Sequence, residues 1–316
     1  MKSYILFVLF IFPLCVTAQI DSLDTKQNRN MFSTAGSVIK NSVLSVPGDF
    51  SEMGHTVSSD WKRTAIYSGS IIGLIAVDRI TTGFLHDQVE PTIDYHLPRI
   101  DVLKTNISGL DGDNAYILYP IAGLYLGSFL ANHEKGQVVA LNAIKSITYS
   151  YVISHLILKS VFKRNRPLRE IGGREFHEAK WTNNPWEFGN YQGNQPIEFR
   201  MGPRGGTSMP SFHTTFYFSV AKVFQMEYNN YWIPYGIATG VWLSNIKGHD
   251  HWVSDILLGG LVGTIIGKSV VNSSRKQMAK TNKSAYNYNP KKFKMTKQLV
   301  PQISTSMVGF HFSGTF

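Results

Sequence analysis

From Thr64 onward, the chain is dominated by apolar stretches of helix length that are rich in Gly, Ala, Leu and Ile. None of them shows the apolar–polar alternation of a half-buried strand. We therefore predict an all-α protein, a helical bundle of about six core helices, with residues 61–272 as the helical domain. The six expected helices are 64–85, 114–132, 137–163, 212–228, 231–246 and 251–272.

Two segments flank this domain. Residues 19–60 are polar, and we expect a short irregular region there with one amphipathic helix near residues 31–44. Residues 273–316 form a basic tail that ends in a short alternating, strand-like segment. In that segment Val308, Phe310, Phe312 and Phe316 share one face.

The hydropathy of the chain leaves its relation to the membrane open. Charged residues make up only 16% of the chain, yet the mean hydropathy is -0.09. The uncharged runs 114–132 and 228–246 have about the length of a membrane span, whereas the other runs are shorter or interrupted by charge. Helix 137–163, for example, carries Lys145 and His155, and central charges are costly in lipid. An integral membrane bundle and a soluble bundle both fit this pattern.

The first eighteen residues have the layout of a secretory signal peptide. Lys2 precedes an apolar stretch, and the small residues Val16 and Ala18 stand before Gln19. This layout predicts cleavage after Ala18. The single cysteine, Cys15, lies in this segment, so the mature protein would have no disulfide, thiol nucleophile or cysteine-ligated metal. We predict export to the cell envelope, with an active site on the periplasmic side.

The net charge of +10 indicates an anionic partner. Residues 256–316 hold eight Lys and one Arg but no Asp or Glu, whereas residues 19–255 are balanced in charge. Export and the confinement of the excess to a tail argue against nucleic acid. The excess suggests that the tail contacts anionic lipid, and a merely solvated tail is the alternative.

The first of three polar clusters is Lys159 to Pro167, where Lys159 and Arg166 are seven residues apart at the end of an apolar stretch. This spacing is about two helical turns, so the two cations are expected on one side of a helix that Pro167 ends. Such a cluster predicts a phosphate site, although a solvated helix end gives the same pattern.

The second cluster, Ser208 to Thr215, follows a glycine-rich approach and opens a helix. The N-terminus of a helix offers free N–H groups and a positive dipole end to an anion. Ser211 adds a hydroxyl group and His213 a titratable proton. An ordinary helix cap by Ser211 is the alternative.

The third cluster runs from Ser244 to Asp255. If His251 and Asp255 stand four apart on one helix, Asp255 can hold one ring nitrogen and raise the basicity of the other. A metal site built from His249, Asp250 and His251 is disfavoured, because neighbouring residues on a helix point in different directions. We expect no metal cofactor.

Together the clusters resemble the superfamily of type 2 phosphatidic acid phosphatases, bacterial class A acid phosphatases and vanadium haloperoxidases. Its pattern is K-x6-RP, then PSGH, then SR-x5-H-x3-D. The resemblance covers about 155–260 closely.

The resemblance implies a metal-independent phosphatase that acts on phosphate monoesters or lipid (pyro)phosphates. Lys159, Arg166, Ser211 and the backbone of Phe212 would bind the phosphoryl group. His251 would be the nucleophile that forms a phosphohistidine, and Asp255 would orient it. His213 would protonate the leaving group and then activate water. Vanadate would be a cofactor only in the haloperoxidase alternative.

Two positions depart from the family pattern. Phe212 stands in place of a glycine, and Asn245 in place of the arginine of the third motif. Asn cannot replace a bidentate cation, so Lys247, Lys163, Arg164 or Arg204 would have to supply the charge. The departure leaves open a degenerate protein that binds anions or lipids at the envelope without catalysis.

Overall fold

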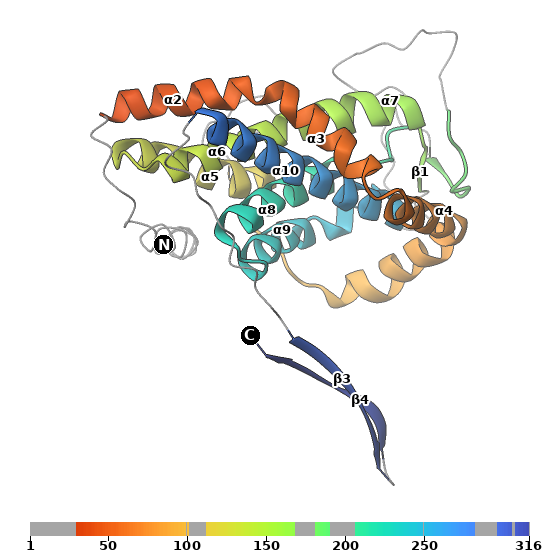
Figure 1. Ribbon diagram of the computed structural model, residues 1–316. Coiled ribbons are helices and arrows are strands. Elements are labelled where there is room, and N and C mark those ends of the chain that lie inside the picture. Colours follow the sequence, from red (N-terminus) through yellow and green to blue (C-terminus); the bar gives the residue numbers. More distant parts are fainter. Residues whose placement is uncertain are drawn as a thin grey trace. The chain divides into compact units, whose positions relative to one another are not determined.

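A computed structural model describes residues 30–98, 100, 112–167, 181–189, 206–248, 250–281, 296–304 and 307–315 (Figure 1). The predicted signal peptide, His249, Arg204 and most of the segment 168–209 lie outside the described residues. The chain divides into two units, Met1–Thr281 and Asn282–Phe316.

The described part of the first unit is helical apart from one small sheet, which confirms the predicted all-α fold. Its α-helices are α2 (Met31–Leu44), α3 (Val46–Ser58), α4 (Trp61–Phe84), α5 (Ala115–Leu130), α6 (Glu134–Tyr149), α7 (Lys159–Phe162), α8 (Phe212–Tyr228), α9 (Trp232–Ser244) and α10 (Val253–Thr281). Two π-helical segments, η1 (Leu85–Val89) and η4 (Ser150–Leu158), continue α4 and α6. Short 3-10 turns are η2 (Glu90–Thr92), η3 (Gly112–Asn114) and η6 (Ile246–Gly248), and the small sheet pairs β1 (Arg166–Pro167) with β2 (Trp181–Thr182) in parallel.

The long helix α10 packs along α8 and also contacts α3, α4 and α6. Glycines on one face of α10 allow this close approach, because a Cβ atom on Gly263 would collide with the carbonyl oxygen of Thr215. The main core lies where α5, α6, α8, α9 and α10 meet, and it includes Ile121, Val139, Phe216 and Val271. This packing fixes the start of α10 beside the start of α8, where the predicted site residues lie.

The structure confirms the helix predicted near residues 31–44, which is α2, but the prediction of an irregular region was wrong for residues 46–58, which form α3. Helix α3 was missed because its buried contact is polar. Asp49 has no exposed surface and binds Lys145 of α6 at 2.9 Å and the hydroxyl group of Tyr149 at 2.8 Å. A helix held by an ion pair leaves little apolar periodicity in the sequence.

The predicted C-terminal boundary at residue 272 also differs from the structure, since α10 continues to Thr281. In the second unit, the expected single strand is one arm of an antiparallel hairpin. It joins β3 (Thr296–Ser304) to β4 (Met307–Thr315), with Thr296 opposite Thr315 and Ser304 opposite Met307.

Helix lengths change the prediction about membrane spans. Helices α5 and α9, which lie in the runs predicted to be long enough, have 16 and 13 residues. Among the described residues, Trp61–Thr92 and Val253–Thr281 are instead the helical stretches that are long and apolar enough to cross a membrane. The first of these is mostly exposed, with Ile66, Ile72, Ile80 and Phe84 on its surface.

Candidate active site

A cleft of about 440 Å³ opens beside the N-terminus of α8. Five of the predicted site residues line it: Ser211, His213, Asn245, Lys247 and His251. Lys159 and Arg166 are not among the lining residues, but their charges act on His213 and His251, which are. Asp255 does not line the cleft either, and its carbonyl oxygen binds the N–H of the lining residue Ser211. The structure therefore brings the three sequence clusters together.

Lys159 and Arg166 converge, but not through a shared helix as the spacing predicted. Helix α7 ends at Phe162, Lys163 adopts a left-handed conformation with φ 41°, and Arg166 lies in β1. Arg166 donates to the hydroxyl group of Thr207 at 3.2 Å and pairs with Asp250 at 2.9 Å. The prediction that Pro167 ends the helix was wrong, because the helix stops before Arg166.

Lys159 is 7% exposed. Burial, together with the charge of Arg166, lowers the pKa of its ammonium group to about 7. A buried cation of this kind gains most from an anion that replaces its lost hydration.

His251 precedes α10, so it does not share a helical face with Asp255 as the i, i+4 spacing predicted. Its Nδ1 lies 2.7 Å from the backbone carbonyl oxygen of Ser208. Because a carbonyl can only accept, Nδ1 carries the proton and Nε2 keeps its lone pair. Burial and the nearby cations Arg166 and Lys159 hold the pKa of His251 well below its usual value. The ring is therefore neutral near pH 7, as a nucleophile requires.

Asp255 makes hydrogen bonds to Ser208 and Trp252, which respectively bind and adjoin His251. Its carboxylate accepts from the Ser208 hydroxyl group at 2.5 Å, from the Trp252 N–H at 3.0 Å and from Arg164 at 2.6 Å. Its own carbonyl oxygen accepts from the Ser211 N–H at 3.0 Å. Among the contacts described, Asp255 reaches the His251 ring through Ser208 rather than by a direct hydrogen bond.

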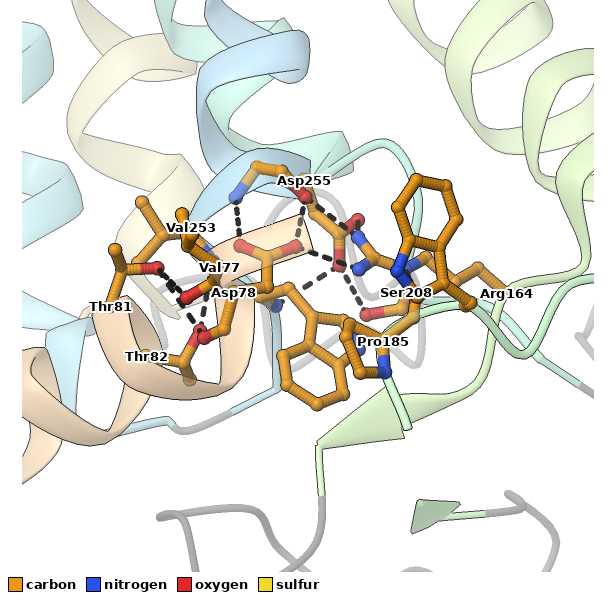
Figure 2. Close-up of polar contacts among 12 residues, drawn as sticks. Val77, Asp78, Thr81, Thr82, Arg164, Pro185, Ser208, Val253 and Asp255 are labelled. Atoms are coloured by element: carbon orange, nitrogen blue, oxygen red, sulfur yellow. Dashed lines mark hydrogen bonds and ion pairs between the residues drawn. The ribbon is translucent and has the colours of Figure 1, made fainter. Parts of the chain in front are cut away.

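A buried ion network extends from Asp255 to α4 (Figure 2). Arg164 is 1% exposed and pairs with both Asp255 and Asp78, the latter at 2.7 Å. Asp78 has no exposed surface and also binds the backbone N–H and hydroxyl group of Ser254. Arg164 is thus fully engaged, so it does not replace the missing motif arginine.

The start of α8 presents Ser211, Phe212 and His213. Ser211 occupies the N-cap position, but its side chain makes no capping hydrogen bond and instead accepts from Thr214 at 3.0 Å. Phe212 packs its ring against Tyr151 and Phe216, while its backbone lies in the first turn, where helical N–H groups lack helical partners. Desolvation by the surrounding protein, with the charges of Lys159 and Arg166, lowers the pKa of His213 to about 4.

Asn245 and Lys247 also line the cleft. Asn245 is exposed and donates from its side-chain amide to the carboxylate of Asp113. Lys247, in the turn η6, lines the cleft. The buried pair His86 and Glu90 lines the same cleft, with Nδ1 of His86 2.5 Å from Oε1 of Glu90.

Sequence reasoning missed the roles of Asp78 and Ser208 and the presence of His86 and Glu90 at the cleft. One signal was available for Asp78, which is the single carboxylate of α4 and follows the apolar run from Ile71 to Val77, so that a partner is needed if it is buried. Within the described residues, no group of three or more His, Cys, Asp or Glu side chains is arranged to hold a metal ion.

Comparison with known proteins finds one family that this part of the chain resembles. Residues 139–279 match the family model of the PAP2 superfamily. This part of the chain is similar to a PAP2 superfamily domain. The three sequence clusters all fall inside the matched segment, whereas Asp78 lies before it.

One curated relative is the lipid A 1-phosphatase of Porphyromonas gingivalis, which is 36% identical over 76 residues. The matched segment is 22% of this chain and 17% of that protein. No solved structure matches the chain closely enough to count as similar.

Proposed function

We propose that this protein is a metal-independent phosphatase that hydrolyses phosphate monoesters or lipid (pyro)phosphates through a phosphohistidine. The observation that carries the proposal is one cleft that His251 and His213 both line, with Nε2 of His251 unprotonated and with the charges of Lys159 and Arg166 acting on both rings. Phosphoryl transfer depends mainly on such positioning and on fixed positive charge. The PAP2 match and the name of the curated relative support the same reaction class.

The proposed mechanism has two displacements at phosphorus. Lys159, Arg166, Ser211 and the N–H groups at the start of α8 hold the phosphoryl oxygens, while Nε2 of His251 forms a bond to phosphorus and the ester oxygen leaves. The backbone carbonyl oxygen of Ser208 accepts a hydrogen bond from the Nδ1–H group of His251 and so stabilises the cationic phosphohistidine.

His213 gives a proton to the leaving oxygen. The bound phosphate dianion adds negative charge beside this residue, and this charge raises its pKa from about 4 toward the value that an acid needs. His213 then takes a proton from water, which attacks phosphorus and releases His251 and inorganic phosphate.

We place this reaction at the periplasmic side of the cell envelope, in contact with a membrane. The exposed apolar surface of Trp61–Thr92 and the curated relative with a lipid substrate in its name support this location. The excess of basic residues after residue 255 fits contact with anionic lipid.

The test is phosphate release by the purified protein from phosphatidic acid, a lipid pyrophosphate and a chromogenic monoester. We expect release in the presence of a metal chelator, and we expect inhibition by orthovanadate, which mimics phosphate. A protein that binds phosphate in the cleft but releases none from these substrates would instead be the non-catalytic anion-binding protein. This second function is favoured by one observation: where the family pattern has an arginine, this chain has Asn245, whose amide binds Asp113.

The lowered pKa of Lys159 predicts the alkaline limb of the pH profile. Below its pKa of about 7 the amine is charged and binds phosphate, so kcat/KM is expected to fall as the pH rises through 7. An arginine keeps its charge throughout this range. In Lys159→Arg, kcat/KM for the chromogenic monoester should therefore stay level from pH 7 to pH 9, even if its value at pH 6 is reduced. If kcat/KM of Lys159→Arg falls above pH 7 as it does in the wild-type protein, the alkaline limb belongs to another group.

The role of Asn245 is tested by restoring the motif arginine. In Asn245→Arg alone we expect less than about a threefold gain in kcat/KM, because Asp113 pairs with the new guanidinium group. In Asn245→Arg with Asp113→Asn, the guanidinium group is available to phosphate, and kcat/KM should rise by about tenfold. Asp113→Asn alone is the matched control. If the double variant gains nothing over this control, a cation such as Lys247 already fills the position.

A further inference from the structure

His213, the proposed general acid, is not oriented by a hydrogen bond. It is exposed and lines the cleft, and within the described residues no hydrogen bond reaches its imidazole ring. A general acid must keep its proton within hydrogen-bond reach of the leaving oxygen, whereas an unrestrained histidine side chain samples several rotamers. Contacts of another kind must therefore fix the orientation of the His213 ring.

Two aromatic side chains pack against this ring. The centroid of the Phe212 ring lies 5.4 Å from that of His213, with an angle of 57° between the ring planes. The centroid of the Tyr217 ring lies 6.0 Å away, at an angle of 42°. Both separations are typical of favourable aromatic pairs. Tyr217 is buried, and its hydroxyl group donates to the side-chain oxygen of Asn114 at 3.0 Å, so this ring is itself fixed.

The Phe212 ring is held by three further rings. Tyr151 and His155 of η4 meet it edge-on, with centroids 6.0 Å and 5.5 Å away. Phe216, which is buried in α8, stacks on it at 6.1 Å. Tyr151 and His155 also stack on each other at 5.1 Å, so the two edge contacts come from one rigid pair. The Phe212 ring therefore has little freedom to turn away from His213.

We propose that the Phe212 side chain is a positioning residue, which holds the His213 imidazole in the orientation that protonates the leaving group. This inference rests on the proposed phosphatase function and adds a residue to it. Glycine, which the family pattern has at this position, has no side chain and so could not make the contact. In this chain the position contributes an aromatic ring to the acid as well as a backbone N–H group to the phosphate.

The test compares two phosphate monoesters that differ in their need for an acid, butyl phosphate and 4-nitrophenyl phosphate. Butoxide is a strongly basic leaving group that must be protonated as it departs, whereas 4-nitrophenolate is a stable anion that leaves without a proton. A defect confined to the general acid therefore lowers kcat/KM for butyl phosphate alone. A general loss of structure or of phosphate binding lowers both values.

The variant Phe212→Leu removes the ring but keeps a large apolar side chain. Its matched control is Phe218→Leu on the same helix, since Phe218 packs against Tyr235 at 5.8 Å and does not line the cleft. Circular dichroism checks that both variants are folded. If Phe212→Leu does not fold, Phe212→Met replaces it.

In Phe212→Leu we expect kcat/KM to fall by about tenfold for butyl phosphate and by less than about twofold for 4-nitrophenyl phosphate, because a general acid contributes about 10²–10⁴-fold in all. Phe218→Leu should leave the ratio of the two values unchanged. In a His213→Ala background, Phe212→Leu should not change the ratio further, because it acts through the missing imidazole. A ratio that Phe212→Leu leaves unchanged in the wild-type background, or changes again in the His213→Ala background, overturns the proposal.

Failure of the phosphatase proposal has a different signature. In that case the wild-type protein hydrolyses neither ester, and NMR of the protein with labelled histidine replaces the kinetics. The ring current of Phe212 displaces the resonances of the His213 ring protons, so Phe212→Leu should shift them and Phe218→Leu should not. Such a shift supports Phe212 as the residue that orients His213. Resonances that stay in place in Phe212→Leu overturn the proposal.

Discussion

His251→Ala is expected to lower phosphate release by about 10⁴-fold or more, because it removes the only atom that the proposed mechanism uses to bond to phosphorus. The loss should fall on kcat rather than on KM, since Lys159, Arg166 and the start of α8 still hold the phosphate. The measurement is steady-state release of phosphate from the best of the substrates named above. A second measurement follows ³²P from labelled substrate, which should remain on the wild-type protein after alkaline quenching and be absent from the variant.

The matched control for this prediction is His96→Ala. His96 is exposed and lines the same cleft, so its loss removes an imidazole without removing the proposed nucleophile. We expect its kcat to change by less than about tenfold. Equal rates in wild-type protein and His251→Ala contradict the phosphohistidine mechanism. Similar losses in both histidine variants show that the cleft was disturbed as a whole.

The sequence was sufficient to predict the all-α fold, because runs of apolar residues without alternation leave helices as the main way to bury the chain. It also located the clusters that meet at the cleft, since each carries residues suited to phosphate. The cleft itself could not be predicted in detail. Whether Lys159 and Arg166 share a helix depends on where α7 ends, and helix ends are set by tertiary contacts more than by local propensity.

The same reason explains the error about His251 and Asp255. Their spacing fits one helical face, but α10 begins at Val253, so His251 lies in the preceding turn and binds the carbonyl oxygen of Ser208. Polar contacts between distant segments leave no periodic signal. Asp78 is more than eighty residues from Arg164, and only the folded chain shows that the two are paired.

Asp78→Ala is expected to have the largest effect on stability, because it leaves Arg164 partly uncompensated in a fully buried site. Removing one partner of a buried ion pair costs about 3–5 kcal/mol of the free energy of unfolding. The measurement is denaturant unfolding or the shift in Tm. Asp87→Ala is the control, since Asp87 is an exposed carboxylate on the same helical stretch and should change stability by less than about 0.5 kcal/mol.

A milder variant separates stability from catalysis. Asp78→Asn keeps an acceptor for the backbone N–H of Ser254 but removes the negative charge beside Arg164. Arg164 then shares its charge with Asp255 alone, and Asp255 binds the Ser208 hydroxyl group less tightly. Because the carbonyl oxygen of Ser208 accepts the hydrogen bond from Nδ1–H of His251, we expect kcat to fall while KM changes little, measured well below the Tm of the variant. A folded Asp78→Asn protein with wild-type kcat shows that the ion network stabilises the fold without positioning the nucleophile.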